Sequence, residues 1–353
     1  MNVRLADFRG LLPAELDAML IVKPENRAYL SGFTGSAGHL LIGRDVAILF
    51  TDFRYIEQAK MEAPHFQVID TSLAIYKTIE TIAEQFAMRK VGFEGDYVTV
   101  STLHLMQEAL TLELVNTSGL TEKLRMIKNQ IELDAMQTAT DIAESALQEI
   151  LPLIKPGMSE MEVAMELEFA MRRKGSEGLP FPIIAASGVR ASLPHGRASH
   201  KIIEKGDFLT LDFGALKNGY CADMTRTFVI GRASPEQEKI YNIVLRAQVA
   251  ALVALKIGLV GKDVDKVARD IIAEEGYGEQ FGHGLGHGVG RLVHEGPSAG
   301  SKSEDVLQAG MVITVEPGIY ILEWGGVRIE DMVCITAEGY HNFNKFSKEL
   351  LCL

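Results

Sequence analysis

A strand-like segment with a carboxylate near its end occurs twice in this chain. Residues 206–214 read GDFLTLDFG and residues 310–318 read GMVITVEPG, so that a first Gly, a Thr, an acid and a final Gly recur in register. Apolar residues surround Asp212 in the first copy and Glu316 in the second. A buried carboxylate is costly unless it is paired. The recurrence predicts a duplicated unit with pseudo-two-fold symmetry; chance is the alternative, because Gly and Thr are common at strand ends.

Each copy is followed by a predicted hairpin that carries a second acid. Asn218-Gly219 is a strong hairpin signal, and a turn centred on Lys217 and Asn218 would place Asp223 directly opposite Asp212. Facing carboxylates in an apolar sheet are tolerable only if one is protonated or a cation lies between them. The alternative is an Asp223 that is solvated at a strand edge.

The second copy predicts the same arrangement. A turn near residues 323–326 lets Glu316 meet Glu330 across a hairpin. Arg328 lies two residues before Glu330, so both side chains point to one face of the strand. The sequence therefore predicts four acids in two facing pairs, with one arginine beside them.

Histidines cluster between the two copies. The segment 281–297 reads FGHGLGHGVGRLVHEGP and carries His283, His287 and His294, while His195 lies in SLPHGRAS. A lone histidine is more often a core or surface residue, but three beside four acids suggest metal ligands. Carboxylates with one or two imidazoles favour Mn²⁺, Co²⁺ or Fe²⁺ over a thiolate zinc site. Two divalent ions would balance four acids and could activate a water, so hydrolysis is the chemistry we expect.

The rest of the chain predicts two domains. In residues 1–120 short apolar runs alternate with helical patterns, which predicts an α/β domain. Residues 120–154 predict a long helix, Ser159 is the expected N-cap of a helix over 159–175, and one further helical stretch is expected at about 235–275. We place the domains at 1–122 and 123–353, a boundary given by the change to a long helical period.

Composition excludes several classes of partner. The formal net charge is -12, whereas a nucleic-acid-binding protein needs a basic footprint. The three cysteines are too few for a disulfide framework. The first residues do not read as a signal peptide, and no apolar run is long enough to span a membrane. We therefore expect neither nucleic acid nor membrane as partner, and a cytoplasmic location.

These motifs resemble the pita-bread metallopeptidases, which include methionine aminopeptidase, aminopeptidase P and prolidase. The segments GHGLGHGVG, VEPGIY and GGVRIEDM carry the resemblance, together with five positions that match the dinuclear metal site of that family. These five are Asp212, Asp223, His287, Glu316 and Glu330. Two ions are implied, with Mn or Co favoured and Zn or Fe possible.

The N-terminal part is similar to the proline-specific branch of the same family. YLSGFTGSAGHLLI at 29–42 and TDFRYIEQA at 51–59 resemble a domain that this branch shares with creatinase, which lacks the metal ligands. The resemblance implies a creatinase-like α/β domain over 1–122 and an α+β pita-bread catalytic domain over 123–353. It also implies short proline-containing peptides as substrates, and a homodimer.

The resemblance assigns roles to further residues. Glu316 is implied as the proton shuttle, His294 as a hydrogen-bond donor to the substrate carbonyl, and Arg328 as the residue that orients the ligands. His195 is implied on the proline side. Tyr320 and His283 match residues of the substrate pocket, and His283 has a structural role as its alternative.

Two activities share these residues. A prolidase, or Xaa-Pro dipeptidase, must recognise the free carboxylate of the proline, whereas aminopeptidase P leaves that side open. Arg291 lies three positions before His294 where many members of the family are apolar, and we hypothesise that it binds this carboxylate. A solvated Arg291 is the alternative. Dipeptidase activity is the favoured prediction, aminopeptidase P the second, and a metal-free binding module the third.

Overall fold

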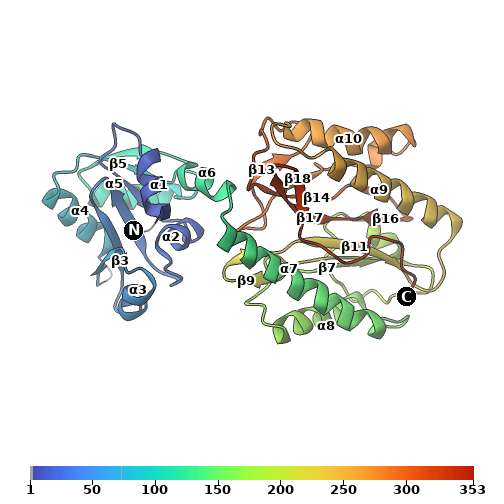
Figure 1. Cartoon of the computed structure of the whole chain (residues 1–353). Helices are drawn as coiled ribbons and strands as arrows, with labels where there is room; N and C mark the ends of the chain where they lie inside the picture. Colours follow the sequence, from blue (N-terminus) through green and yellow to red (C-terminus); the bar gives the residue numbers. More distant parts are fainter. Residues whose placement is uncertain (1–2, 73) are drawn as a thin grey trace. The chain divides into compact units, whose positions relative to one another are not determined.

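The chain folds into two compact units. The structure, a computed structural model, describes residues 3–72 and 74–353 (Figure 1). Contacts divide the chain into Met1–Arg125 and Met126–Leu353. Helix α6 (Leu120–Met126) contains both this division and the position after residue 122 where the sequence analysis placed the boundary.

A mixed six-stranded sheet forms the first unit, with helices packed against it. Its strand order is β4-β3-β2-β1-β5-β6, with parallel pairs β1–β5, β5–β6 and β3–β4 and antiparallel pairs β1–β2 and β2–β3. The strands are β1 (Ala18–Ile21), β2 (His39–Gly43), β3 (Ala47–Thr51), β4 (Gln67–Asp70), β5 (Lys90–Phe93) and β6 (Glu113–Asn116). The helices are α1 (Val3–Leu11), α2 (Pro24–Ser31), α3 (Ile56–Glu62), α4 (Ile75–Gln85), α5 (Val100–Ala109) and α6. Two separate apolar clusters, one around Phe8 and one around Phe50, show that the sheet is buried on both faces, as expected of an α/β unit.

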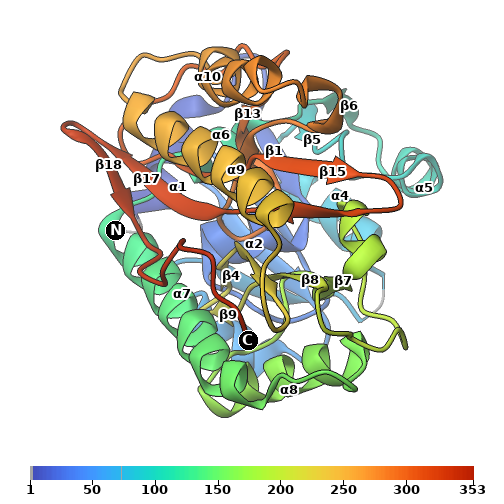
Figure 2. The same cartoon turned by 90° about the vertical axis from the view of Figure 1, so that its right-hand side faces the viewer.

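The second unit places two sheets between pairs of helices. Its sheets have the orders β11-β8-β7 and β13-β12-β14-β17-β18, with short ladders β9–β10 and β15–β16 beside them. The first strands are β7 (Ile184–Ser187), β8 (Phe208–Phe213), β9 (Leu216–Lys217), β10 (Tyr220–Cys221) and β11 (Met224–Val229). The later strands are β12 (Gly286–Gly288), β13 (Glu295–Ala299), β14 (Val312–Val315), β15 (Gly318–Ile321), β16 (Gly325–Arg328), β17 (Asp331–Thr336) and β18 (Gly339–Asn342). Helices α9 (Pro235–Ala254) and α10 (Gly261–Glu274) lie on one side of the strands, and α7 (Gln130–Ile150) and α8 (Glu160–Arg173) on the other (Figures 1 and 2).

Capping decides where the helices of this unit begin. Ser159 accepts a hydrogen bond from the backbone N–H of Glu162 and the Glu162 side chain bonds back, which confirms the predicted N-cap. Asn129 caps α7 in the same way. The predicted single helix over 120–154 is therefore wrong, because the chain must leave helical geometry at this cap. The helical stretch expected at 235–275 is likewise two helices, α9 and α10, with Gly258 at φ +84° between them.

The first hairpin sets the register of Asp212. Asn218 and Gly219 are its two central residues, with φ of +51° and +70°, as a type I′ turn requires. Asp212 is therefore paired with Thr225, and the predicted pairing of Asp212 with Asp223 is wrong by two residues. A shift of two residues keeps a side chain on the same face of a strand. Asp223 therefore still lies on the side of Asp212, diagonally rather than directly opposite.

The second hairpin has the predicted register. Gly318 pairs with Arg328 in β15–β16, and Val315 pairs with Asp331 in β14–β17. Both ladders continue one alignment, which puts Glu316 opposite Glu330. The repeat extends to the backbone, since Gly206 and Gly310, which precede the two strands, have φ of +91° and +85°. Both copies thus need a left-handed residue at the same point.

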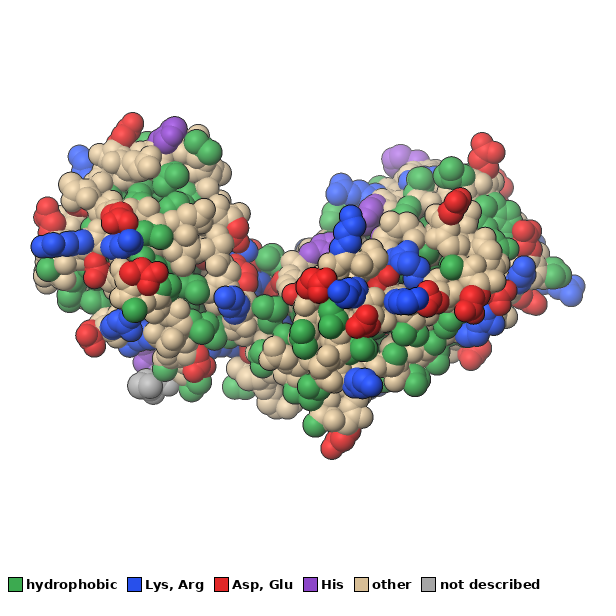
Figure 3. Space-filling model, turned by 90° about the horizontal axis from the view of Figure 1, so that it is seen from above, with side chains coloured by type: hydrophobic (Ala, Val, Ile, Leu, Met, Phe, Trp, Pro, Cys, Tyr) green, Lys and Arg blue, Asp and Glu red, His purple; other side chains and the backbone are tan. Residues whose placement is uncertain are grey.

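Charges of both signs cover the surface. Figure 3 shows acidic and basic side chains interspersed over the visible face, without a broad basic stripe on that face. A search of the described residues for a helix both long and apolar enough to cross a bilayer finds none.

A buried ion pair joins the two halves of the second unit. Arg226 on β11 donates to Asp331 on β17 at 2.8 Å, and both side chains are at most 2 % exposed. The Arg226 guanidinium also donates to the carbonyls of Glu330, Phe346 and Ser347. This one side chain therefore connects the first copy of the repeat, the second copy and the C-terminal segment.

Removing this cation should destabilise the second unit strongly. We expect Arg226→Met to lower the free energy of unfolding by about 3–5 kcal/mol, because Asp331 keeps only Lys348 as a cationic partner and four carbonyls lose a donor. Urea unfolding followed by circular dichroism measures the change. The matched control is Arg232→Met, at an exposed arginine nearby, which should change stability by less than about 0.5 kcal/mol. Equal effects of the two substitutions would contradict the assignment.

Candidate metal centre

A cavity of about 530 Å³ opens in the second unit at the point where the two hairpins meet. All four predicted acids line it, namely Asp212, Asp223, Glu316 and Glu330. The four predicted histidines also line it, namely His195, His283, His287 and His294. Arg328 reaches the same cavity. The structure thus brings together residues that are far apart in the sequence.

The strands place the four acids and His287 close to one another. Asp212 lies on β8, Asp223 just before β11, His287 on β12, and the two glutamates follow β14 and β16. The His287 Nε2 atom lies 3.3 Å from Glu316 Oε1 and 3.7 Å from Asp223 Oδ2. One ligand atom each from Asp223, His287 and Glu330 lies within 4.8 Å of the others. Such spacing suits simultaneous contact with one ion.

Glycine lets the histidine strand come this close. A Cβ atom on Gly286 would lie 2.0 Å from the carbonyl oxygen of Thr314 on the neighbouring strand. The side-chain hydroxyl of Thr314 accepts from the backbone N–H of His287 and donates to Glu316, at 3.0 Å in both cases. The glycine before His287 is therefore a steric requirement, and the repeated Thr aligns two of the site residues.

Burial, reinforced by mutual repulsion, dominates the electrostatics of the acids. Burial raises the pKa of Asp223 well above its usual range, and the charges of Glu330 and Asp212 add to the rise. Burial also raises the pKa of Glu330, reinforced by Glu316 and Asp212. For Glu316 burial acts in the same direction, but the hydrogen bond and charge of His287 outweigh it and lower the pKa to about 2. Ionisation of all four acids therefore needs more positive charge than the chain supplies.

Arg328 is the arginine that offsets part of this charge. Its guanidinium donates to Asp212 Oδ2 at 2.6 Å, to Thr225 at 3.0 Å, to Tyr320 at 2.8 Å and to the Pro194 carbonyl at 3.1 Å. The second carboxylate oxygen of Asp212, Oδ1, is buried and has no hydrogen-bond partner among the described residues. One arginine bonded to one of four acids, with a carboxylate oxygen left over, fits hard divalent cations.

A chain of hydrogen bonds fixes the state of His283. Because Arg328 donates to the Tyr320 oxygen, the Tyr320 hydroxyl donates to His283 Nε2, 2.9 Å away. The other ring nitrogen, Nδ1, then carries the hydrogen and donates to the Gly284 carbonyl at 2.8 Å. Burial lowers the pKa of His283 and raises the pKa of Tyr320 to about 12. Both groups are therefore neutral at pH 7. His283 lines the cavity, and Tyr320, which is not among the described lining residues, holds the His283 ring from behind.

Comparison with known proteins places the chain in a family. Residues 134–337 match the model of metallopeptidase family M24, and residues 4–127 match the creatinase/prolidase N-terminal domain. The chain belongs to metallopeptidase family M24. It therefore has the predicted creatinase-type N-terminal domain and pita-bread catalytic domain. Membership implies divalent metal ions, and Asp223, His287 and Glu330, whose ligand atoms lie within 4.8 Å of one another, fit such an ion.

Relatives and solved structures cover nearly the whole of this M24 chain. It is 40% identical to the Xaa-Pro dipeptidase of Pyrococcus furiosus over 95% of each chain. The structure of an Xaa-Pro dipeptidase from Bacillus anthracis superposes with a TM-score of 0.97 at 45% identity, covering 99% of both chains. That of an X-Pro aminopeptidase from Thermotoga maritima superposes with a TM-score of 0.92 at 37% identity, covering 99% of this chain and 100% of the other.

Arg291 lies apart from the lining of the cavity. Its guanidinium carbon is 5.2 Å from the centroid of the Tyr220 ring, and a guanidinium nitrogen lies beside Gly219 in the hairpin turn. The described lining residues do not include it. The carboxylate-binding role of Arg291 stays a prediction.

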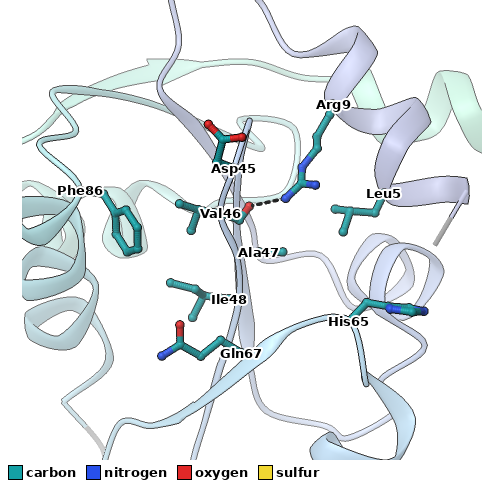
Figure 4. Close-up of a pocket in the computed structure, with 9 residues that line it drawn as sticks. All are labelled: Leu5, Arg9, Asp45, Val46, Ala47, Ile48, His65, Gln67 and Phe86. Atoms are coloured by element: carbon teal, nitrogen blue, oxygen red, sulfur yellow. Dashed lines mark hydrogen bonds between the residues drawn. The ribbon is translucent and has the colours of Figure 1, made fainter. Parts of the chain in front are cut away.

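A second cavity lies in the creatinase-type domain of this M24 protein. It has a volume of about 390 Å³ and lies between β3, β4 and the ends of α1 and α4 (Figure 4). The Arg9 side chain donates to the carbonyls of Gly43 and Val46, at 3.0 and 3.2 Å. The Arg9 guanidinium is thus hydrogen-bonded to backbone carbonyls. The described lining residues of this cavity include no cluster of acids and histidines.

A buried carboxylate that was not predicted from the sequence, Glu160, holds the His195 segment. One oxygen of Glu160 accepts from the backbone N–H and hydroxyl of Ser187, at 2.7 and 3.0 Å. The other oxygen accepts from the backbone N–H and hydroxyl of Ser199, at 3.1 and 2.7 Å, and pairs with Arg190. Both ends of the segment 187–199 are therefore tied to one side chain. In the sequence Glu160 looks like an ordinary first-turn helix residue, so no local pattern reveals this.

Replacing Glu160 by glutamine should loosen that segment. The new NH₂ group would face donors, so we expect Glu160→Gln to lower the free energy of unfolding by about 1–3 kcal/mol. Hydrogen exchange of amides in residues 187–199 should become faster. Glu166→Gln on the exposed face of the same helix is the control and should change neither quantity. Unchanged exchange in the Glu160 variant would contradict the proposed anchoring.

The repulsion among the acids predicts how the metal-free protein responds to pH. The raised pKa of Asp223 means that the folded state keeps a proton which the unfolded state has lost above about pH 4. The metal-free fold therefore loses stability as the pH rises through this window. After chelation we expect Asp223→Asn to melt at a higher temperature than wild type, with a larger difference at pH 8 than at pH 5. Asp270→Asn, on the surface, is the control; a lower melting temperature for Asp223→Asn at pH 8 would contradict the account.

Proposed function

We propose that this protein hydrolyses the Xaa-Pro bond at the N-terminus of short peptides and favours Xaa-Pro dipeptides. The meeting of four buried acids and His287 in one cavity carries the proposal. The relatives named Xaa-Pro dipeptidase support the substrate class. The ligands that we propose are those predicted from the sequence, namely Asp212, Asp223, His287, Glu316 and Glu330.

The metals would be two divalent ions. Four carboxylates to one imidazole make an oxygen-rich donor set, which suits Mn²⁺ or Co²⁺, with Zn²⁺ and Fe²⁺ as the other candidates. When bound, such ions supply a Lewis acid for the carbonyl and lower the pKa of a water to near neutrality. Arg328 fixes the Asp212 carboxylate through its 2.6 Å hydrogen bond and so orients one ligand of the set.

The other site residues would act directly on the peptide. Glu316 is the proposed proton carrier from the attacking water to the proline nitrogen. His294 has its pKa lowered by burial and by the charge of His287, so a neutral ring with one N–H is available to the substrate carbonyl. His195 would line the proline side, and the Tyr320–His283 pair would support the opposite wall.

The proline residue limits how the site can recognise the peptide. The Xaa-Pro bond is a tertiary amide and offers no N–H to an enzyme. Recognition must therefore use the shape of the ring and the charges at the two ends of the peptide. Phe181, Pro182 and Val293, which line the same cavity, supply an apolar surface for the ring.

Aminopeptidase P activity is the second candidate. The T. maritima X-Pro aminopeptidase is nearly as similar in structure as the dipeptidase from B. anthracis. The two activities differ in whether the residue after proline can be accommodated. The predicted homodimer and cytoplasmic location are proposals that rest on the resemblance to the family and on the sequence; sedimentation of the purified protein tests the first of them.

A direct assay tests the proposed function. Protein dialysed against EDTA should hydrolyse neither Ala-Pro nor Ala-Pro-Ala. Addition of Mn²⁺ or Co²⁺ should restore cleavage, with Ala-Pro the better substrate and Zn²⁺ tested beside them. Ala-Ala serves as the control peptide without proline. Faster release of alanine from Ala-Pro-Ala would favour aminopeptidase P instead, and no turnover with any of the three metals would favour a binding role.

A further inference from the structure

One cation on the cavity wall has no partner among the described residues. Arg197 and Arg328 are the arginines in the described lining of the metal cavity. The guanidinium of Arg328 is used by Asp212, Thr225, Tyr320 and the Pro194 carbonyl. Arg197 is exposed, and the described part of the chain gives its guanidinium neither a hydrogen bond nor an ion pair. Its charge is therefore free to meet an anion in the cavity.

Sheet register points this side chain toward the metal centre. Arg197 forms an antiparallel bridge with Ile184, and Ile184 pairs with Asp212 in β7–β8. Paired residues project to the same face of a sheet, so Arg197, Ile184 and Asp212 form one row on the cavity side. Neighbouring strands lie about 4.8 Å apart, which puts the backbone of Arg197 about 10 Å from that of Asp212.

Hydrogen bonds fix the backbone of Arg197, whereas its guanidinium has no partner among the described residues. Its carbonyl accepts from Arg190 at 2.9 Å, and its N–H donates to the His195 carbonyl at 2.8 Å. Arg190 is itself paired with the buried Glu160. The chain thus presents Arg197 from a fixed position, which lowers the entropic cost of capturing a ligand.

We propose that Arg197 binds the C-terminal carboxylate of an Xaa-Pro dipeptide and so selects peptides of two residues. The inference rests on the proposed function. One residue spans at most about 3.6 Å, so a dipeptide whose scissile carbonyl lies beside Asp212 carries its carboxylate over Ile184, toward Arg197. The proline ring then lies over Ile184, which belongs to the same apolar lining as Phe181, Pro182 and Val293. A guanidinium binds a carboxylate through two parallel hydrogen bonds, which fits a fixed distance from the reacting bond.

The geometry favours Arg197 over Arg291 for this role. Both are arginines close in sequence to a cavity histidine, His195 and His294 respectively. Only Arg197 lines the cavity in the described structure, whereas Arg291 lies against Tyr220. Arg197 is therefore a specificity residue: it contacts one end of the substrate and takes no part in bond breaking.

The test compares peptides that differ only at the C-terminus. Metal-loaded wild type and Arg197→Leu are assayed on Ala-Pro and on Ala-Pro-amide, which lacks the carboxylate. We expect the substitution to lower kcat/KM for Ala-Pro by about 10- to 100-fold, mainly through KM. The value for Ala-Pro-amide should change by less than about 2-fold. Arg197→Lys keeps the charge without the fork of two donors. Its kcat/KM for Ala-Pro should lie between the values for wild type and Arg197→Leu.

Two further variants complete the design. Arg232→Leu is the matched control at an exposed arginine outside the cavity and should leave both peptides unaffected. Arg291→Leu tests the rival residue: a selective loss on Ala-Pro there, and not in Arg197→Leu, would overturn the proposal. Thermal melting of each variant separates loss of binding from loss of folding.

The remaining outcomes separate this inference from the proposed function. An active wild type whose Arg197→Leu variant loses Ala-Pro and Ala-Pro-amide equally, or loses neither, overturns the role of Arg197 and leaves Xaa-Pro hydrolysis standing. A wild type that cleaves neither peptide with any divalent metal overturns the proposed function, and the role of Arg197 with it.

Discussion

Repulsion among four buried carboxylates is the constraint around which the second unit is built. Asp212, Asp223, Glu316 and Glu330 line one cavity, and Arg328 is the arginine that bonds to one of them. Without further positive charge the chain must leave some of these acids protonated, which is what the raised pKa of Asp223 and that of Glu330 express. Divalent ions remove that conflict, so binding free energy and folding free energy of this unit are coupled.

The repeat explains how one fold delivers four acids to one point. Each copy contributes a strand, a carboxylate near the end of the strand, and a hairpin that returns a second carboxylate. The copies differ in register: the second pairs its two acids directly, while the first pairs Asp212 with Thr225 and places Asp223 diagonally. The hydroxyl of Thr225 then donates to Glu330 at 2.6 Å. Thr225, which lies opposite Asp212 in the first copy, therefore bonds to an acid of the second copy. The two copies of the repeat depend on each other for this reason.

Much of this site could be predicted from the sequence because an error of two residues in strand pairing leaves each side chain on the same face of the sheet. The hairpin turn was placed one residue too early, at Lys217-Asn218 instead of Asn218-Gly219, and the pairing was therefore wrong by two residues. Side chains in a strand alternate with a period of two, so the acids still share a face. The same reasoning fails for residues whose partners come from distant segments. Glu160 ties down a loop that begins 27 residues later, and nothing in its own helix indicates this.

The contrast between Arg291 and Arg197 shows the same limit and bears on specificity. Proximity to His294 in the sequence suggested Arg291, whose side chain lies beside Tyr220 and the hairpin turn and whose role stays a prediction. Two backbone pairings, from Arg197 to Ile184 and from Ile184 to Asp212, bring the other arginine into line with the acids. If Arg197 selects peptide length as we propose, different side chains in one row of a sheet carry metal ligation and this selection. A substitution at the exposed end of that row could change the peptides accepted without altering the four acids, because Arg197 bonds to none of them.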